Sequence, residues 1–181
     1  MKLLLNEDFP SWGFEIQMGA TTIWERWNTI RSDGQFGPVD MNSFNHYAYG
    51  AVGDWMFEHL AGLQIIEPGY RKSRIAPLFA QSGLSHARCS IQTPYGLLGS
   101  DWKIADRKLT MAVTVPANTS AEVVIPTPSA DAMRVNNFPA ERAPGVKSST
   151  WKDGRLTLLI ASGNYQFTTP QPPEGHGAES R

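Results

Sequence analysis

Glu25 is the carboxylate in this sequence whose neighbours most favour chemistry. It lies between Trp24 and Trp27 in the segment ATTIWERW, whose β-branched and aromatic residues predict extended or irregular backbone. Aromatic faces stack on the C–H surfaces of sugars, and carboxylates accept hydrogen bonds from hydroxyl groups or transfer protons. A glutamate flanked by tryptophans is more often structural, however, so these residues alone leave both interpretations open.

His46 is the second candidate, because it precedes the best predicted helix of the chain. Apolar residues from Ala48 to Leu63 recur close to the 3.6-residue helical period, and Gly62 stands near the end. The start of a helix favours a neutral imidazole over a protonated one. By itself His46 is more often a capping residue than a ligand-binding one. Three further residues can cap this start: Asn42, Ser43 and Asn45. Small residues in the helix predict that it is buried on more than one side.

The charge of the chain is unevenly distributed. The 181 residues carry a net charge of −1, but residues 1–70 hold 3 basic and 9 acidic residues, with four of the six tryptophans. An acidic, Trp-rich segment is typical of a carbohydrate cleft, although two domains with different surfaces explain the asymmetry equally well. The near-neutral total argues against a nucleic-acid or membrane partner, and no apolar run approaches the ~18 residues of a membrane span. The compartment stays unknown, and is cytoplasmic if Met1 is the true start.

The sequence lacks the residues that several other kinds of site require. The single Cys89 excludes a disulfide framework and a Cys-rich zinc module, and it reads as a buried strand residue. We find no Gly-rich phosphate loop and no metal-ligand cluster, so we expect neither a cofactor nor a metal. Asp33 and Asp40 are typical turn residues, and His176 is expected in solvent.

The predicted secondary structure that positions these residues changes along the chain from helix and loop to short strands. A short helix is predicted around Phe14–Met18 with a stop at Gly19, and residues 28–42 read as a loop. Beyond Gly69, tight turns at 105–106 and 153–154 separate short apolar runs, which predict an antiparallel β-sandwich. The runs are Arg74–Pro77, Leu84–Thr93, Leu97–Ile104, Lys108–Val115, Ala121–Ile125, Leu156–Ala161 and Tyr165–Thr168.

The predicted organisation is residues 1–69 as a helical part, 70–169 as the sandwich and 170–181 as a disordered tail. One good helix and a few pieces cannot bury their own apolar faces. The helical part therefore reads as the end of a larger helical domain. We expect its uncovered apolar patch to self-associate or to meet a missing N-terminal partner.

Three motifs in this order resemble bacterial α-L-rhamnosidases: GATTIWERW (19–27), MNSFNHYAYGAVGDW (41–55) and PGYRKSRIAP (68–77). The turn at 93–96, the S-W-K strand at 100–103 and the segment 113–119 resemble the same family, so the resemblance extends to about Pro170. These enzymes are glycoside hydrolases with a barrel of paired helices followed by a β-sandwich. The resemblance implies the C-terminal helices of a truncated α/α-barrel followed by an antiparallel β-sandwich.

The family hydrolyses terminal α-L-rhamnosides with inversion, so the implied partner is a rhamnose-containing glycoside. Glu25 matches the glutamate of its T-x-W-E motif, the general base, and desolvation beside the indoles would strengthen that carboxylate as a base. His46 matches a histidine that hydrogen-bonds rhamnose, and Trp24 is expected to stack on the sugar. Asn42 and Asn45 are expected to orient the loop.

The resemblance also implies that the family's general acid lies upstream of this chain, which would then be inactive alone. Two alternatives stay open. The chain could be a non-catalytic carbohydrate-binding or assembly module, or one half of a split enzyme.

Overall fold

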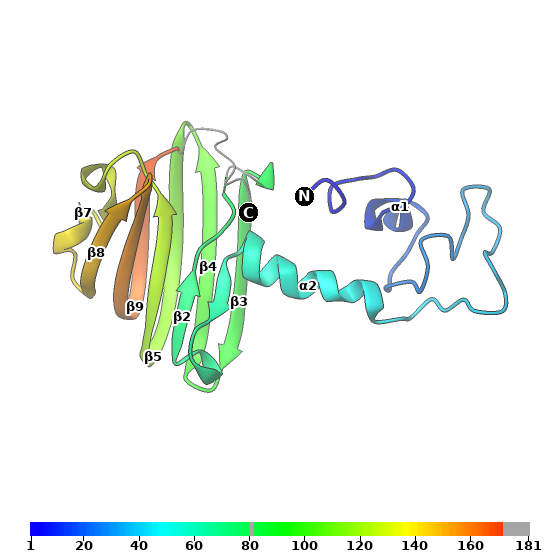
Figure 1. Ribbon diagram of the computed structural model, residues 1–181, viewed down its shortest axis with the longest axis horizontal. Helices are drawn as coiled ribbons and strands as arrows, with labels where there is room; N and C mark the ends of the chain where they lie inside the picture. Colours follow the sequence, from blue (N-terminus) through cyan, green and yellow to red (C-terminus); the bar gives the residue numbers. More distant parts are fainter. Residues whose placement is uncertain (80–81, 172–181) are drawn as a thin grey trace. The chain divides into compact units, whose positions relative to one another are not determined.

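The computed structural model describes residues 1–79 and 82–171 (Figure 1). The chain forms two compact units, residues 1–55 and residues from Met56 onward, each described here by itself. This division comes earlier in the chain than the predicted boundary at 69/70, because β1 pairs with β2 of the second unit. The predicted tail, 170–181, lies outside the described residues from position 172 onward.

In the first unit, helix α1 spans Trp12–Gln17. The Ser11 side-chain oxygen accepts a 2.9 Å hydrogen bond from the Phe14 N–H, which caps the start of the helix. The helix ends at Met18, and Gly19 follows with a φ of 88°, a left-handed conformation that glycine adopts at little cost. The predicted helix and its stop are confirmed, with a start two residues earlier.

The predicted long helix is present but irregular. A 3-10 helix (Ala48–Ala51), α2 (Val52–Trp55) and a π-helix (Met56–Leu60) follow one another, in place of one α-helix reaching residue 63. Glycine in a helix interior costs about 1 kcal/mol relative to alanine, and this run contains Gly50 and Gly53.

The prediction that this run is buried on more than one side is wrong, since Leu60 is its only buried residue. Burial needs partner helices, and α1 is the only other α-helix among the described residues. The paired helices of a barrel are therefore not seen in the part of the chain that the structure describes.

The second unit is mostly β-sheet, as Figure 1 shows, and matches the predicted sandwich. Short 3-10 helices at Pro68–Tyr70, Ala130–Ala132 and Ala140–Arg142 connect its strands. The strands are β1 (Leu63–Ile65), β2 (Lys72–Ile75), β3 (His86–Thr93), β4 (Gly96–Ala105), β5 (Lys108–Pro126), β6 (Arg134–Val135), β7 (Phe138–Pro139), β8 (Val146–Lys152) and β9 (Arg155–Pro170).

Two long strands build both layers of the sandwich. The pairing of β5 with β9 shifts register between Val115 and Ser120, a bulge that bends the strands. Before the bulge, β5 pairs with β4. The C-terminal end of β9, which pairs with this same part of β5, also pairs with β6. Beyond the bulge, β5 pairs with β2, and β9 pairs with β8. Each long strand replaces two of the predicted short ones.

The expected antiparallel pairing holds for every described strand pair except one. Strand β2 runs parallel to β5, with Lys72 opposite Ser120 and Ile75 opposite Val123. The path from β2 to β5 passes through the β3–β4 hairpin, so these two strands are not joined by a short turn, and nothing forces them to run antiparallel.

The predicted turn at 153–154 is confirmed, and the one predicted at 105–106 lies one residue later, at Asp106–Arg107. Ala105 pairs with Lys108 and Lys152 pairs with Arg155, which leaves two-residue loops between the strands. Both residues of each loop have positive φ, between 50° and 73°, as type I′ hairpin turns require. The side chains between the layers form one apolar core, which includes Trp102, Met111, Ile125, Leu158 and Phe167.

Candidate functional site

Main-chain hydrogen bonds bring the segment that contains Glu25 beside the segment that contains His46. The His46 N–H donates to the Ile23 carbonyl oxygen at 2.8 Å, and the Glu25 N–H donates to the Ser43 carbonyl oxygen at 2.9 Å. The Thr22 hydroxyl donates to the Phe44 carbonyl oxygen and adds a third bond between the same two segments. The two sequence-predicted residues therefore lie on adjacent stretches of backbone, although neither stretch is a regular strand.

Glu25 is half-buried in this arrangement. No ion pair reaches its carboxylate within the described residues. The following turn is closed by the Arg26 N–H, which donates to the Thr29 hydroxyl at 3.3 Å, and by the Thr29 N–H, which donates to the Arg26 carbonyl oxygen at 3.1 Å. A carboxylate without a cationic partner can accept hydrogen bonds from a water molecule or a hydroxyl group.

The His46 ring makes two contacts that fix its orientation. Its Nδ1 accepts a 3.2 Å hydrogen bond from the Ala48 N–H, and the ring stacks on Tyr47 with centroids 5.2 Å apart. A neutral imidazole that accepts at Nδ1 carries its proton on Nε2. Nε2 is then a donor suited to the hydroxyl group of a ligand.

Trp24 lies inside the unit. It is 2% exposed and packs edge-on against Phe44 at 5.6 Å. Within the described residues this ring serves as packing, and its stacking on a sugar stays a prediction.

Asn42 and Asn45 differ in their contacts. Asn42 Nδ2 donates to the Thr29 carbonyl oxygen at 3.2 Å, which ties the two ends of the loop together. The Asn42 Oδ1 is buried and has no hydrogen-bond partner within the described residues. Asn45 is exposed, and its main-chain N–H donates to the Ser43 hydroxyl at 3.2 Å.

Glu15 is a residue of this region that the sequence analysis missed. Its side chain is 2% exposed, and burial raises its pKa to about 7, against the lowering effect of a hydrogen bond from the Trp24 main chain. The available signal was a glutamate within the apolar run around Phe14 and Ile16. A second missed feature is an aromatic cluster, in which Trp27 stacks on Tyr49 at 4.1 Å and meets Trp12 edge-on at 5.1 Å.

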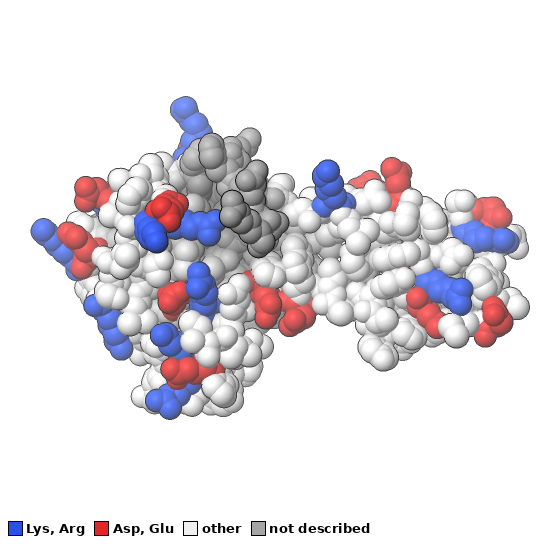
Figure 2. All heavy atoms as spheres, in the orientation of Figure 1, with Lys and Arg blue, Asp and Glu red and all other residues white. Residues whose placement is uncertain are grey.

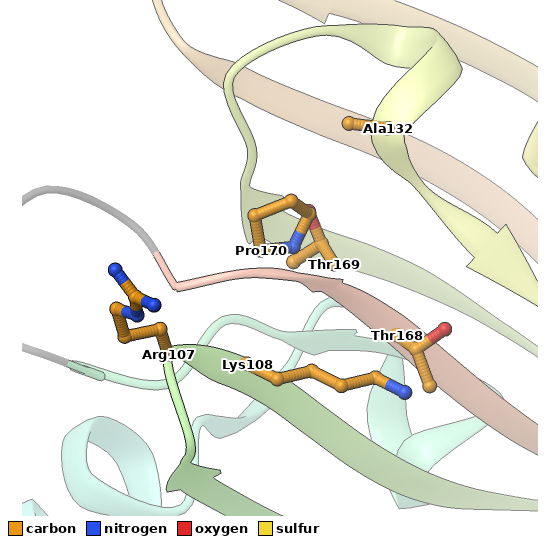
Figure 3. A pocket seen from close by; sticks show the side chains of 6 residues that line it. All are labelled: Arg107, Lys108, Ala132, Thr168, Thr169 and Pro170. Atoms are coloured by element: carbon orange, nitrogen blue, oxygen red, sulfur yellow. The ribbon is translucent and has the colours of Figure 1, made fainter.

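The second unit has a cavity of its own, of about 310 Å³, drawn in Figure 3. Lys108 extends toward Thr168 across the paired strands, and Arg107 projects from the neighbouring hairpin turn. None of the described residues that line this cavity is a carboxylate. The lining residues are Arg107, Lys108, Ala132, Thr168, Thr169 and Pro170.

Residues 1–79 and 82–171 lack two further kinds of feature. No group of three or more His, Cys, Asp and Glu residues in these ranges could hold a metal ion. No helix in the same ranges is long and apolar enough to cross a membrane.

Two family models match the chain in sequence. Residues 1–60 match the bacterial α-L-rhamnosidase six-hairpin glycosidase domain, and residues 62–137 match the bacterial α-L-rhamnosidase C-terminal domain. The first match contains the paired segments around Glu25 and His46, and the second covers the first strands of the sandwich. These matches show that the chain combines parts of two domains of the bacterial α-L-rhamnosidase family.

Known proteins that are similar to this chain are α-L-rhamnosidases. An α-L-rhamnosidase of Formosa agariphila is 41% identical over 92% of this chain, and one of Streptomyces avermitilis is 37% identical over 92%. The crystal structure of the Streptomyces avermitilis α-L-rhamnosidase complexed with L-rhamnose superimposes with a TM-score of 0.82 at 36% identity, over 93% of this chain. The Dictyoglomus thermophilum α-L-rhamnosidase gives a TM-score of 0.76 at 26% identity, over 94% of this chain.

The chain belongs to the bacterial α-L-rhamnosidase family and corresponds to a C-terminal part of these enzymes. It spans 18% of the length of the Formosa agariphila relative and 15% of the Streptomyces avermitilis one. The family resemblance found in the sequence motifs is confirmed.

Proposed function

We propose that this chain supplies the general base and one sugar ligand of an α-L-rhamnosidase that hydrolyses terminal α-L-rhamnosides with inversion. Glu25 is the base, and His46 binds the rhamnose. The observation that carries the proposal is the pairing of residues 22–25 with residues 43–46, because it gathers a half-buried carboxylate without an ion pair and an imidazole with a defined donor.

In an inverting mechanism, one carboxylate removes a proton from the attacking water while a carboxylic acid on the other face of the sugar protonates the leaving oxygen. The two groups stand roughly 6.5–9.5 Å apart to leave room for that water. Glu25 takes the first role. The acid is contributed from outside this chain, which is therefore inactive alone, because loss of a proton-transfer group costs roughly 10²–10⁴ in rate.

The imidazole of His46 has a positioning role in this scheme. Its Nε2–H donates to a rhamnose hydroxyl, while the Ala48 N–H holds the opposite nitrogen. Because this hydrogen bond is made in both the ground state and the transition state, it contributes mainly to substrate binding.

A chimera tests the proposal. The 167 residues of this chain that align with the Streptomyces avermitilis relative replace its matching segment, and hydrolysis of p-nitrophenyl α-L-rhamnoside is measured. We expect turnover that Glu25→Gln lowers by about 10² or more and that Glu7→Gln, at an exposed carboxylate of the same unit, leaves unchanged. NMR should show inversion in the first product formed. Full activity of the Glu25→Gln chimera would refute the assigned base, and turnover by the 181-residue chain alone would refute its inactivity.

The remainder of a six-hairpin domain is the proposed partner of the first unit. Figure 2 shows broad uncharged areas on the part formed by residues 1–55. Val39 and Tyr47 are 92% and 88% exposed, and Ile16 is 69% exposed. Exposed apolar groups in such number mark an interaction surface. The other large apolar residues exposed in this unit are Leu3, Leu5, Phe9, Phe36, Met41 and Phe44.

The cavity between Lys108 and Thr168 supports a second candidate function, a carbohydrate-binding module. Its cations and hydroxyl groups can hydrogen-bond a glycan but cannot cleave one. Calorimetry of the whole chain with rhamnose decides between the two candidates. Binding that survives Glu25→Ala with His46→Ala but is lost in Lys108→Ala would favour the module.

A further inference from the structure

The cavity of the second unit lies where three parts of the sandwich meet: the turn between β4 and β5, the end of β9, and the 3-10 helix Ala130–Ala132 (Figure 3). Lys108 pairs with Pro170, and the Gln171 N–H donates to the Arg107 carbonyl oxygen at 2.8 Å. These contacts fix the backbone of the turn against the end of β9. A volume of about 310 Å³ is at the lower end of the range for small-molecule sites, so the cavity has room for one small ligand.

Arg107 occupies a backbone position that glycine usually takes. The chain has two hairpin turns of the same type, Asp106–Arg107 and Asp153–Gly154, with positive φ at both residues of each. The second position is glycine in one turn and Arg107, with a φ of 57°, in the other. A side chain is strained in this left-handed region, whereas glycine is not. Among the described residues, none makes an ion pair or hydrogen bond with the Arg107 guanidinium, so no such contact within the fold explains the arginine.

Lys108 and Thr168 bring two more hydrogen-bond donors to the cavity. Thr168 is the direct partner of Thr110, so Lys108, two residues earlier on β5, lies diagonal to Thr168 on the same face of the sheet. In Figure 3 the Lys108 side chain extends toward Thr168. Neither the ammonium group nor the Thr168 hydroxyl is bonded to another side chain or peptide group of the described residues. Both groups are therefore available to a ligand.

Thr169 forms a fixed wall of the cavity. The Thr127 hydroxyl donates to the Ser129 carbonyl oxygen at 2.9 Å and shares a 2.8 Å hydrogen bond with the Thr169 hydroxyl. Because the Thr127 hydroxyl has only one proton, the Thr169 hydroxyl is the donor in the shared bond. Thr169 is 3% exposed, and its proton is not available to a ligand. The binding groups are thus the three side chains of Arg107, Lys108 and Thr168.

This set of groups favours an anion over a neutral sugar. Guanidinium and ammonium groups are donors without an acceptor, and both are positively charged. Asp106 and Asp131 are next to lining residues in the sequence, but neither of them lines the cavity. A carboxylate or sulfate group only accepts hydrogen bonds, and such bonds between charged groups are the stronger ones. The hydroxyl groups of a neutral sugar also donate, and the two cations cannot accept from them.

We propose that this cavity binds the acidic group of a sugar, either a carboxylate or a sulfate ester, through Arg107, Lys108 and the Thr168 hydroxyl. That a sugar carries the anion rests on the proposed function, because a rhamnosidase acts on a glycoside. The anion site itself does not depend on that function, nor on the role of Glu25. The sandwich would then hold an acidic residue of the glycan that the enzyme cleaves.

NMR titration of the 181-residue chain tests the ligand class. Glucuronate, glucose 6-sulfate and neutral glucose are added in turn, and the amide signals of Lys108, Thr168 and Ala132 are followed. We expect saturable shifts with at least one acidic sugar and none with glucose. The responding sugar tells a carboxylate from a sulfate ester, and binding should weaken at about 1 M salt, where charges are screened. Shifts from glucose as large as those from both acidic sugars would overturn the proposal.

Inorganic sulfate separates the anion from the sugar that carries it. If inorganic sulfate shifts the same amides with at least the affinity of both acidic sugars, the sugar part of the proposal is refuted and the anion site stands. If none of the charged probes shifts these amides, the anion site itself is refuted. Neither result bears on Glu25, because turnover of the rhamnosidase chimera decides the role of that residue.

Two variants test the assigned residues. Lys108→Gln and Arg107→Gly should each weaken binding of the acidic sugar by about tenfold or more, because each removes a charged donor. Arg155→Gln is the matched control, since Arg155 follows the Asp153–Gly154 turn as Lys108 follows the other turn, and it does not line the cavity. Affinity that is unchanged in both Lys108→Gln and Arg107→Gly would overturn the proposal.

The melting temperature separates a binding role of Arg107 from a structural one. Glycine relieves the backbone strain at this position, so Arg107→Gly should raise the melting temperature by about 2–4 °C while it weakens binding. A lower melting temperature in Arg107→Gly would assign the arginine to the fold and remove it from the site.

Discussion

The main-chain N–H of His46 lies 2.8 Å from the carbonyl oxygen of Ile23 and donates a hydrogen bond to it. Together with the bond from Glu25 to Ser43, at 2.9 Å, this contact pairs two irregular segments that the sequence leaves separate. The pairing needs no particular side chain, because it uses peptide groups. It places Glu25 and His46 on adjacent stretches of backbone without a helix or strand to carry them.

The first prediction concerns His46 in the rhamnosidase chimera. Replacing it by alanine removes one donor to the sugar, and a hydrogen bond of this kind contributes about 1 kcal/mol, so KM should rise by roughly fivefold to tenfold. The value of kcat should change less, as expected for an interaction made equally in the ground and transition states. Steady-state kinetics measures both. His86→Ala, at an exposed histidine of β3, is the control, and an unchanged KM in His46→Ala would remove the histidine from the site.

The second prediction follows from the buried carboxyl of Glu15. Burial raises its pKa from 4.5 to about 7, so between these values the folded state binds more protons than the unfolded state. The stability of the first unit should therefore fall as the pH rises from 4.5 towards 7, by up to roughly 3 kcal/mol, and level off above that.

Urea unfolding followed by tryptophan fluorescence, at pH 5 and at pH 8, checks this prediction. Glu15→Gln cannot ionise, so most of the difference between the two pH values should disappear in that variant. An equal pH dependence in the original chain and in Glu15→Gln would assign the effect to other groups.

The third prediction concerns the sandwich core. Trp102 is fully buried, and its Nε1–H donates to the Leu60 carbonyl oxygen at 2.8 Å. Trp102→Phe leaves that oxygen without its donor and reduces the packed volume, so the free energy of unfolding should fall by about 2–4 kcal/mol. Trp151→Phe is the matched control, since Trp151 is 46% exposed and its bond to Thr127 is longer, at 3.3 Å. Thermal unfolding of both variants should show a much larger loss for the first.

The fourth prediction compares two glycines with positive φ. A Cβ at Gly62 would lie 2.3 Å from the Pro77 nitrogen, whereas one at Gly154 would meet nothing within 4 Å. Gly154→Ala should cost only the strain of its backbone, about 1 kcal/mol, and Gly62→Ala should cost clearly more because the main chain must also move. Equal melting temperatures for the two variants would contradict the close approach at Gly62.

The fifth prediction is that the isolated chain self-associates through its first unit. Sedimentation velocity should show an average mass that rises with concentration, together with binding of a dye that reports apolar surface. Val39→Ser with Tyr47→Ser should weaken the association, because both side chains are almost fully exposed. Leu97→Ser, at a 48% exposed position of β4, should leave it unchanged. A strictly monomeric chain without dye binding would count against an uncovered face.

Local patterns in the sequence determined much of the fold. Turn chemistry predicted the loop at Asp153–Gly154 and, one residue too early, the loop at Asp106–Arg107, because few residues tolerate positive φ at both positions of a two-residue turn. Gly19 likewise predicted the end of α1. The motifs around Glu25 and His46 indicated the family, which the matches to known proteins confirmed.

The tertiary structure decided what depends on contacts between distant residues. The parallel pairing of β2 with β5, the fusion of short strands into β5 and β9, and the pairing of residues 22–25 with 43–46 all join parts of the chain without a local signal. Small residues in the helical run after His46 predicted burial on more than one side, yet burial requires partners that the composition of the run does not supply. Glu15 shows the same limit: its residue type predicts exposure, and only the packing around α1 buries it.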